Sequence, residues 1–356
     1  MDIENHSEII NCAKDGRKKE TLVSTGAVVK EIGKTEEKEE RGEIEEITEI
    51  TIDDDYLNII SELKNHIFIN PDFDIPVYVQ KCKAKNKKIL VLSGGGLKGI
   101  AHIGGIKALE DLDLLKNIDT FAGTSVGSLL LFLFVIGYTA SELYEFTGNF
   151  DLGKLRNLEF MQLIEKFGMD DGKRFTYFLK KMLSAKKIDP DITFLELYNL
   201  TKKTLIMTGV CVNDLKISYM SYITYPSMPV ITAVTISSCF PLVSAPISYD
   251  NKLWVDGGCI DNYPIRLFDD RLDDVIGIYL DTIRDQNPVI SNLEEYLKQV
   301  LLCLFTSVSI LNINGYEKYT AHVKSQDKSV TNYTLNMEEK NELYKIGYDT
   351  VHSKFC

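Results

Sequence analysis

From residue 89 onward, short runs of consecutive apolar residues alternate with longer segments in which apolar residues recur every three or four positions. The short runs predict buried strands, and the recurring positions predict helices. Strands are predicted at 89–92, 118–122, 204–212, 216–225, 252–255 and 275–280, and helices at 100–112, 126–136 and 228–237. Strands interleaved with helices predict an α/β fold of three layers, α/β/α, in which a mostly parallel central sheet is covered on both faces.

The first 88 residues follow a different pattern. Residues 1–55 carry 17 acidic and 8 basic residues, and 31–49 has no aromatic and little bulky apolar content. Such a segment cannot bury enough surface to offset its ordering entropy, so 1–52 is predicted to be an acidic disordered leader. Residues 53–88 are predicted to hold a short amphipathic helix at 56–67 and a lysine-rich lead-in, interpreted as solvated, with anionic lipid contact as the alternative.

Charge, apolar runs and cysteines limit the class of protein. The rest of the chain carries 35 acidic and 32 basic residues, so no nucleic-acid partner is expected. The longest uninterrupted apolar run, Leu129–Ile136, is eight residues, whereas a membrane span needs about 20. No transmembrane segment or signal peptide is expected, and the seven cysteines lack C-x-x-C spacing. These features predict a cytoplasmic protein with reduced thiols and no metal.

A glycine-rich turn, Ser93-Gly94-Gly95-Gly96-Leu97-Lys98-Gly99, connects the first predicted strand to the first helix. Several backbone N–H groups near a helix N-terminus favour a negative group, which can be a pyrophosphate or the oxyanion of an acyl-transfer intermediate. The turn also matches G-x-G-x-x-G. However, Asp119 lies at the start of its strand, where it cannot act as the acidic residue of a dinucleotide site.

A second turn, Gly123-Thr124-Ser125-Val126-Gly127, again lies between a strand and a helix. The spacing G-x-S-x-G is that of a nucleophile elbow, in which bulk beside the serine would clash and the serine Oγ is raised above the sheet. The apolar helix that follows is predicted to be central and buried.

A third turn, Asp256-Gly257-Gly258, follows the strand at 252–255. Asp-Gly also favours an ordinary tight turn, so this motif alone is not specific. Together, a donor loop, an elbow serine and a strand-end aspartate fill every role of a hydrolase site.

At these residues the chain resembles the patatin-like phospholipase family, which pairs a G-G-G-x-[RK]-G loop, a G-x-S-x-G serine and a D-G-[GA] aspartate in this order. The stretch 192–197 is similar to the family's I-T-F-x-E-L, and 236–241 to its A-S-x-A-x-P, with Ile236 and Cys239 in place of alanines. The resemblance covers 89–268 as the catalytic domain. Residues 269–356 are expected to complete the same body with strands and helices, ending in a helix at 336–355.

The resemblance implies a lipid acyl hydrolase of phospholipase A type that needs no cofactor. It assigns Ser125 as the nucleophile and Asp256 as the general base of a dyad that forms an acyl-enzyme. The expected oxyanion loop comprises Gly94, Gly95, Gly96, Lys98 and Gly99, of which Gly95 and Gly96 would donate N–H groups and Lys98 would stabilise the oxyanion or orient the loop. Gly123 and Gly127 shape the elbow, and Gly257 and Gly258 the acid motif.

Three alternatives stay open at this point. A Ser-Asp-His triad would need His322, placed in a polar loop, or His352, placed on the terminal helix. A nucleotide-dependent oxidoreductase would use the G-x-G-x-x-G at 94–99. A catalytically silent lipid-binding module would keep the fold without the chemistry.

The substrate implies peripheral, reversible docking on membrane or micellar lipid. The expected contact is the stretch 146–187, predicted to be poorly regular, in which apolar residues alternate with Lys173, Arg174, Lys180, Lys181, Lys186 and Lys187. The alternative is a helical cap that packs inward and never contacts lipid.

Overall fold

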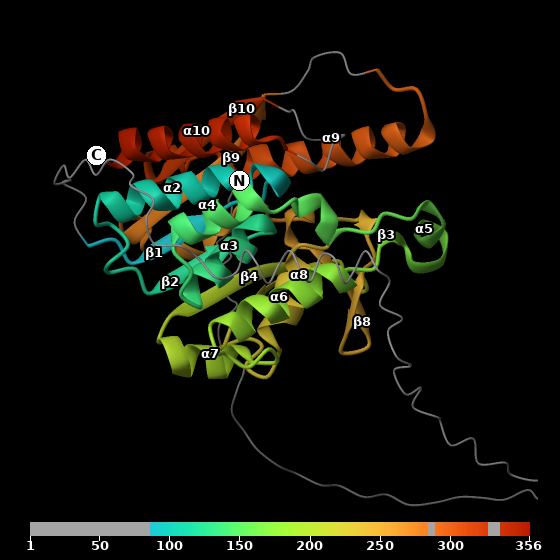
Figure 1. Ribbon diagram of the computed structural model, residues 1–356, viewed down its shortest axis with the longest axis horizontal. Helices are drawn as coiled ribbons and strands as arrows, with labels where there is room; N and C mark the ends of the chain where they lie inside the picture. The colour runs from blue at the N-terminus through green and yellow to red at the C-terminus, as the bar shows by residue number, and fades with distance from the viewer. Residues whose placement is uncertain (1–85, 284–288, 327–334) are drawn as a thin grey trace, which may run out of the picture. The chain divides into compact units, whose positions relative to one another are not determined.

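The structure is a computed structural model that describes residues 86–283, 289–326 and 335–356. These residues all belong to one compact unit (Figure 1). The acidic leader at 1–52 and the amphipathic helix at 56–67 lie outside the described residues.

A central sheet of eight strands is formed by the described residues, in the order β10-β9-β1-β2-β4-β8-β7, with β5 pairing with β4 as a branch. Strands β10, β9, β1, β2 and β4 run parallel to one another. Strands β8 and β5 pair antiparallel with β4, and β7 pairs antiparallel with β8. The strands are β1 (Ile89–Leu92), β2 (Thr120–Gly123), β4 (Thr204–Cys211), β5 (Lys216–Met220), β7 (Ile247–Tyr249), β8 (Lys252–Asp256), β9 (Val275–Ile283) and β10 (Thr320–Gln326). The predicted mostly parallel α/β sheet is confirmed.

Helices surround this sheet, and a small parallel pair, β3 (Gly168–Asp170) with β6 (Leu242–Ser244), lies apart from it. The α-helices are α2 (Gly99–Asp111), α3 (Val126–Val135), α4 (Ala140–Asn149), α5 (Phe160–Lys166), α6 (Lys173–Ala185), α7 (Phe194–Thr201), α8 (Val230–Ser237), α9 (Leu293–Ile313) and α10 (Met337–Phe355). Short 3-10 turns are η1 (Gly96–Lys98), η2 (Leu152–Leu155), η3 (Gly257–Cys259), η4 (Pro264–Phe268), η5 (Leu272–Asp274) and η6 (Glu317–Tyr319).

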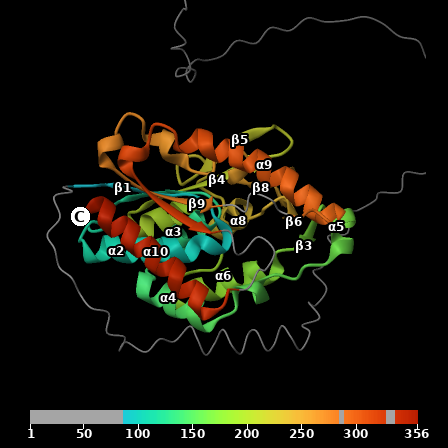
Figure 2. The same ribbon diagram turned by 90° about the horizontal axis from the view of Figure 1, so that it is seen from above.

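Strand β1 is buried on both faces, which explains why its sequence is continuously apolar. Leu90 and Leu92 belong to the large core cluster that includes residues of α2 and α3, whereas Ile89 and Val91 belong to a second cluster with residues of the 263–279 segment. A strand buried on both faces reads as an unbroken apolar run. Figure 2 shows the sheet between α9 on one side and α2, α3 and α10 on the other, which confirms the three layers.

The C-terminal segment shares the sheet and the core of the segment before it. Strand β9 pairs with both β1 and β10, and α10 packs closely on α2. Glycines make this approach possible: a Cβ at Gly104 would lie 2.0 Å from the Tyr344 carbonyl oxygen, and one at Gly347 1.9 Å from that of Ala101.

Three local predictions are wrong. Strand β5 ends at Met220 and not at 225, because Ser221 donates its N–H to Thr224 Oγ1 at 3.0 Å and starts a turn. His322 lies on β10 and not in a loop. The stretch 146–187 is regular: it contains α5, β3 and α6, and α6 buries one apolar face.

Helix α9 is the largest element without a specific prediction. Its window Glu295–Ile313, 19 residues, is long and apolar enough to cross a membrane by length and composition, and only 6% of that window is buried. It is a candidate by length and composition only, so the expectation of no transmembrane segment stays a prediction. Thr306, Ser307 and Ser309 interrupt the apolar run without making the helix polar on average, so a search for uninterrupted runs misses it.

Candidate active site

Ser125 lies in the sharp turn between β2 and α3, with φ 55° and ψ −125°. A positive φ is unfavourable for any residue with a Cβ, and such strain is found where function requires it. Glycine is needed on either side: a Cβ at Gly123 would lie 2.8 Å from the Gly127 carbonyl carbon, and one at Gly127 2.7 Å from the Leu92 and Ser93 oxygens. Close packing of β1, β2 and α3 therefore holds the serine in this geometry.

A buried network of serine hydroxyls ties the turn to α3 and α8. Ser128 donates its hydroxyl to the Gly123 carbonyl at 2.7 Å, and its Oγ lies 2.9 Å from Ser237 Oγ on α8. Ser237 must therefore donate to Ser128, and it accepts the N–H of Ser125 at 3.0 Å. The backbone N–H of Ser125 is thus occupied by the protein.

Asp256 lies at the end of β8, which is separated from β2 by β4 and runs antiparallel to both. Strand β4 extends four residues beyond Met207, the partner of Gly123 on β2. Strand β8 pairs antiparallel with this extension, Asp256 opposite Gly209, so its carboxyl end points back toward the elbow. Glycine at 257 permits the turn, since a Cβ there would lie 2.0 Å from Thr208 Oγ1.

The Asp256 carboxylate is almost completely buried, with 2% of the residue exposed. It accepts the Gly258 N–H on Oδ1 at 2.8 Å, and it lines the same cavity as Ser125. Burial raises the pKa of Asp256 to about 6, against the opposing effects of the Ser125 hydroxyl, the Gly258 N–H and the Arg156 charge. At neutral pH the carboxylate is mostly ionised and is more basic than an exposed one, as a general base requires.

The glycine-rich loop offers fewer free donors than its sequence suggests. Gly94 donates its N–H to the Asn262 carbonyl at 3.0 Å, and Gly99 donates to the Gly96 carbonyl. In the described part of the chain, the N–H groups of Gly95 and Gly96 have no protein acceptor, and both residues line the cavity with Ser125. Gly94 has another role: a Cβ there would lie 3.2 Å from the Ser125 Cβ, so glycine lets the loop approach the nucleophile.

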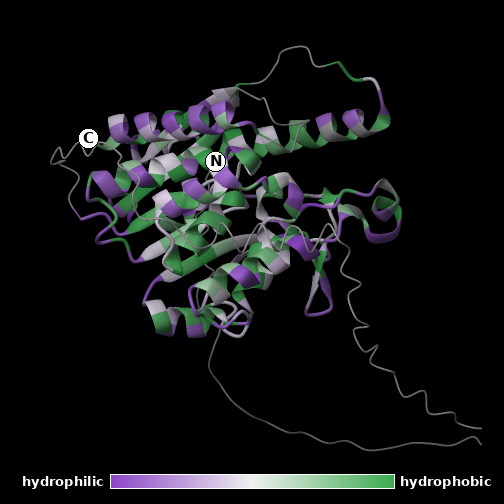
Figure 3. Ribbon diagram, in the orientation of Figure 1, coloured by the Kyte–Doolittle hydropathy of each residue, from purple (hydrophilic) through white to green (hydrophobic). Residues whose placement is uncertain are grey.

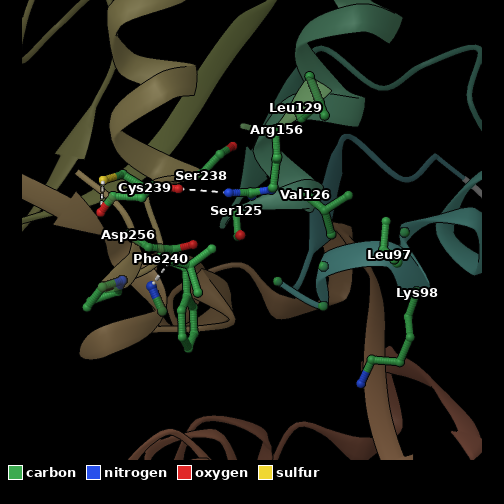
Figure 4. Close-up of a pocket in the computed structure, with 18 of the residues that line it drawn as sticks. Leu97, Lys98, Ser125, Val126, Leu129, Arg156, Ser238, Cys239, Phe240 and Asp256 are labelled. Atoms are coloured by element: carbon green, nitrogen blue, oxygen red, sulfur yellow. Dashed lines mark hydrogen bonds between the residues drawn. The ribbon is translucent and has the colours of Figure 1, made fainter. Parts of the chain in front are cut away.

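Lys98 extends away from Ser125 (Figure 4). Its ammonium donates a hydrogen bond to the hydroxyl of Thr282 at the end of β9. Of the two roles that the sequence left open, this contact favours orientation of the loop over direct contact with an oxyanion.

Arg156, just after η2, is a cavity residue that sequence reasoning missed. Its guanidinium donates to Ser244 Oγ at 2.8 Å and lies 3.6 Å from the buried Asp170 carboxylate. Figure 4 shows it beside Ser125. Its charge acts on Asp256 by lowering that carboxyl's pKa. No motif surrounds Arg156, so only the tertiary structure brings it to the site.

These groups line a cavity of about 910 Å³ whose other walls are mainly apolar. This size is typical of sites for organic ligands. The apolar lining comes from α3, α4, α6 and α9, and includes Leu129, Leu133, Leu143, Phe146, Phe178 and Leu301. An acyl chain would fit this apolar lining, because it would leave few polar groups unpaired.

The histidines lie elsewhere. His102 is fully buried and donates Nε2–H to the Ser93 carbonyl at 2.8 Å, and burial lowers its pKa to about 4. His322 Nε2 lies 3.0 Å from Asp281 Oδ2, and neither His322 nor His352 lines the cavity. Within the described ranges, no histidine completes a triad with Ser125 and Asp256.

The dinucleotide alternative gains no support from the geometry. Asp119 directly precedes β2, at the amino end of the strand, whereas the glycine-rich loop follows the carboxyl end of β1. No group of three or more His, Cys, Asp or Glu residues that could hold a metal ion is found in the part of the chain that the structure describes.

An α/β fold with an elbow serine, a buried strand-end aspartate and free glycine N–H groups is typical of serine hydrolases. The patatin-like phospholipase family matches residues 90–269, half of the chain, and this protein belongs to that family. The resemblance seen in the sequence is therefore confirmed, and lipid hydrolysis is the general activity that this membership supports.

Two relatives and one solved structure are similar to this chain to different degrees. The chain is 31% identical over 198 residues to the probable lipid hydrolase 463L of Invertebrate iridescent virus 6, covering 53% of this chain and 66% of that protein. It is 29% identical over 290 residues to the uncharacterized protein R571 of Acanthamoeba polyphaga mimivirus, covering 78% and 95%. The crystal structure of VipD from Legionella pneumophila shares the fold, with a TM-score of 0.52 at 16% identity over 82% of this chain and 72% of that one.

Proposed function

We propose that this protein is a phospholipase of A type that cleaves fatty-acyl esters through a Ser125–Asp256 dyad. The observation that carries the proposal is that the strained Ser125 and the buried Asp256 line one mainly apolar cavity, where the Ser125 hydroxyl lowers the pKa of the Asp256 carboxyl. An activated serine beside a positioned base is what covalent acyl transfer requires.

In the first half of the reaction, Asp256 takes the proton of Ser125 as Oγ attacks the acyl carbonyl carbon. The carbonyl oxygen becomes an oxyanion, which the N–H groups of Gly95 and Gly96 would stabilise. Each such donor is typically worth about 3–4 kcal/mol in the transition state. The C–O bond to the glycerol side breaks, and the leaving alkoxide takes the proton from Asp256, which leaves an acyl ester on Ser125.

In the second half, a water molecule attacks this ester while Asp256 takes its proton. The fatty acid leaves, and the proton returns to Ser125 Oγ. The dyad and the backbone donors fill every role in this cycle, so the proposed reaction requires no metal or cofactor. Two further residues assist without contacting the reacting atoms. Lys98 holds the donor loop against β9, and the charge of Arg156 lowers the pKa of Asp256.

The test compares Ser125→Ala and Asp256→Asn with the wild type on a phospholipid and on a short-chain soluble ester. Each variant is expected to lose on the order of 10³-fold or more in kcat/KM, and the double variant no more than the worse single one, because the two residues act as a unit. Ser184→Ala, an exposed serine on α6, is the matched control and should keep full activity. A fluorophosphonate should label the wild type at Ser125. Activity within about tenfold of wild type in either dyad variant would contradict the proposal.

A further inference from the structure

Two segments far apart in the sequence expose large apolar side chains beside the cavity. Helix α5 and its flanks expose Leu158, Met161, Ile164 and Phe167, and α9 with the residues before it exposes Val289, Ile290, Leu293, Tyr296, Val300, Leu304 and Leu311. We call these residues the rim surface. Figures 1 and 2 both place α5 and the amino-terminal part of α9 at the same end of the molecule.

The rim surface is continuous with the cavity lining. Leu163 and Ile164 of α5 and Leu293, Leu297 and Leu301 of α9 line the cavity, and Ile164 and Leu293 are also strongly exposed. The same two helices therefore form the wall of the cavity and the apolar surface outside it.

Helix α9 has two adjoining apolar stripes. Leu293, Val300, Leu304 and Leu311 follow one another at intervals of seven, four and seven residues, which places them on one side of a helix. Leu297, Leu301 and Phe305 form the neighbouring stripe, which lines the cavity. From Gln299 to Ile313 the helix carries no charged residue, and Figure 3 shows apolar residues recurring along it.

We propose that the rim surface docks on the apolar boundary of a phospholipid bilayer, so that the cavity opens directly onto the membrane. Exposed apolar patches of this kind mark interaction sites. A bilayer fits better than a protein partner because the patch continues into a cavity for an acyl chain, and because α9 has the length and composition of a membrane-embedded helix. An acyl chain could then pass from lipid to cavity without crossing water. This inference rests on the proposed lipase function.

The lysines of α6 and of the residues just after it, which the sequence also offered for lipid contact, form a weaker docking surface. Lys180 pairs with Asp191 at 3.0 Å, and Lys186 pairs with Glu142 at 3.1 Å, so part of their charge is already compensated. Docking through the rim surface is expected to depend on apolar contact and only weakly on salt.

The experiment measures binding of the full chain to vesicles of zwitterionic phosphatidylcholine by flotation. Met161→Ser/Leu304→Ser removes two rim side chains, 66% and 61% exposed, that do not line the cavity. Leu200→Ser/Ile223→Ser is the matched control, because these residues are 60% and 70% exposed, on α7 and after β5, and also lie outside the cavity.

The rim variant is expected to bind vesicles at least about tenfold more weakly than the wild type, and the control within about twofold. The kcat/KM for a soluble short-chain ester should be unchanged in both variants, whereas hydrolysis of vesicle phospholipid should fall only in the rim variant. High salt should change wild-type binding by less than about twofold.

The inference is overturned if the wild type does not bind vesicles, or if the rim variant binds them as well as the wild type does. It is also overturned if the control variant loses as much vesicle binding as the rim variant, or if the rim variant loses as much activity on the soluble ester as on vesicle phospholipid. A wild-type dimer that the rim variant converts to monomer would assign the surface to a second copy. Vesicle binding is also measured with Ser125→Ala, which separates docking from chemistry: a protein that binds vesicles but hydrolyses no ester contradicts the proposed function and leaves docking supported.

Discussion

Two helices that line the cavity meet different environments: α3, which we call the floor, is buried in the core, and α9, which we call the outer wall, is mostly exposed. Helix α3 begins next to Ser125 and is buried along most of its length, with Leu131 and Phe132 fully inaccessible. Helix α9 is less apolar over its whole length but has a long apolar window, of which only 6% is buried. Apolar composition thus determines that a helix avoids water, but not whether it does so in the core or, as we propose for α9, against lipid.

The two regions also differ in strain and charge. Beside the floor, Ser125 has a positive φ and Asp256 carries a buried carboxylate, both of which are costly to keep folded. Residues Gln299–Ile313 of α9 carry no charge. The packing of the floor therefore stabilises a reactive geometry, which leads to the following predictions.

The largest effect on stability is expected at α3. Leu131→Ala should lower the free energy of unfolding by about 2–5 kcal/mol, because it leaves a cavity in a closely packed core. Urea denaturation followed by circular dichroism measures this. A loss below about 0.5 kcal/mol would show that α3 is not the packed support of the elbow.

At the elbow, Gly127→Ala should cost about 1–3 kcal/mol and reduce activity at least about tenfold. The new Cβ would lie 2.7 Å from the Leu92 and Ser93 carbonyl oxygens, so the start of α3 must shift and carry Ser125 with it. Gly137→Ala is not a suitable control, because φ there is 98° and strains any side chain. Gly148→Ala is suitable, since its Cβ would meet no atom closer than 3.6 Å. Unchanged activity in Gly127→Ala would contradict the tight fit.

Asp256→Asn should stabilise the protein at pH 7 by about 1–3 kcal/mol while it abolishes activity. The folded pKa of Asp256 is raised to about 6 from 3.8, so between these values the unfolded state binds fewer protons. Stability from this group is therefore lost as pH rises from about 4 to about 6. Thermal melts of both proteins at pH 4 and pH 7 test this: the difference between them should be larger at pH 7.

The same pKa predicts how activity depends on pH. Asp256 acts as a base only when ionised, so kcat/KM on a soluble ester should rise with pH and reach half its plateau near pH 6. A half-point near 4 would mean that the carboxylate behaves as if it were exposed.

The smallest effect is expected on the rim. Leu304→Ala should change the free energy of unfolding by less than about 0.5 kcal/mol, because the side chain is already exposed when the protein is folded. A loss comparable to that of Leu131→Ala would show that α9 is packed in solution, and would remove the contrast between the two helices.

Much of the fold could be predicted because its signals are local. The unbroken run at β1 and the elbow at 123–127 each depend on neighbouring residues, and the structure contains both. In the stretch 146–187, α5 has only seven residues and so carries a weak signal. Helix α6 has 13 residues, and its buried Phe178, Leu179 and Met182 lie at helical spacing, a local signal that the prediction of a poorly regular stretch missed.

The sequence by itself determined the residue types at the site and their order: a glycine-rich loop, an elbow serine and an aspartate before two glycines. It could do so because each turn requires small residues at set spacings. The tertiary structure alone decided how these turns meet. Asp256 comes close to Ser125 because β4 extends beyond the end of β2 and β8 pairs antiparallel with that extension. The Gly94 N–H is not free, because it donates to the Asn262 carbonyl. Arg156 and α9 come to the cavity in the same way, since contacts between distant segments depend on packing that no local pattern records.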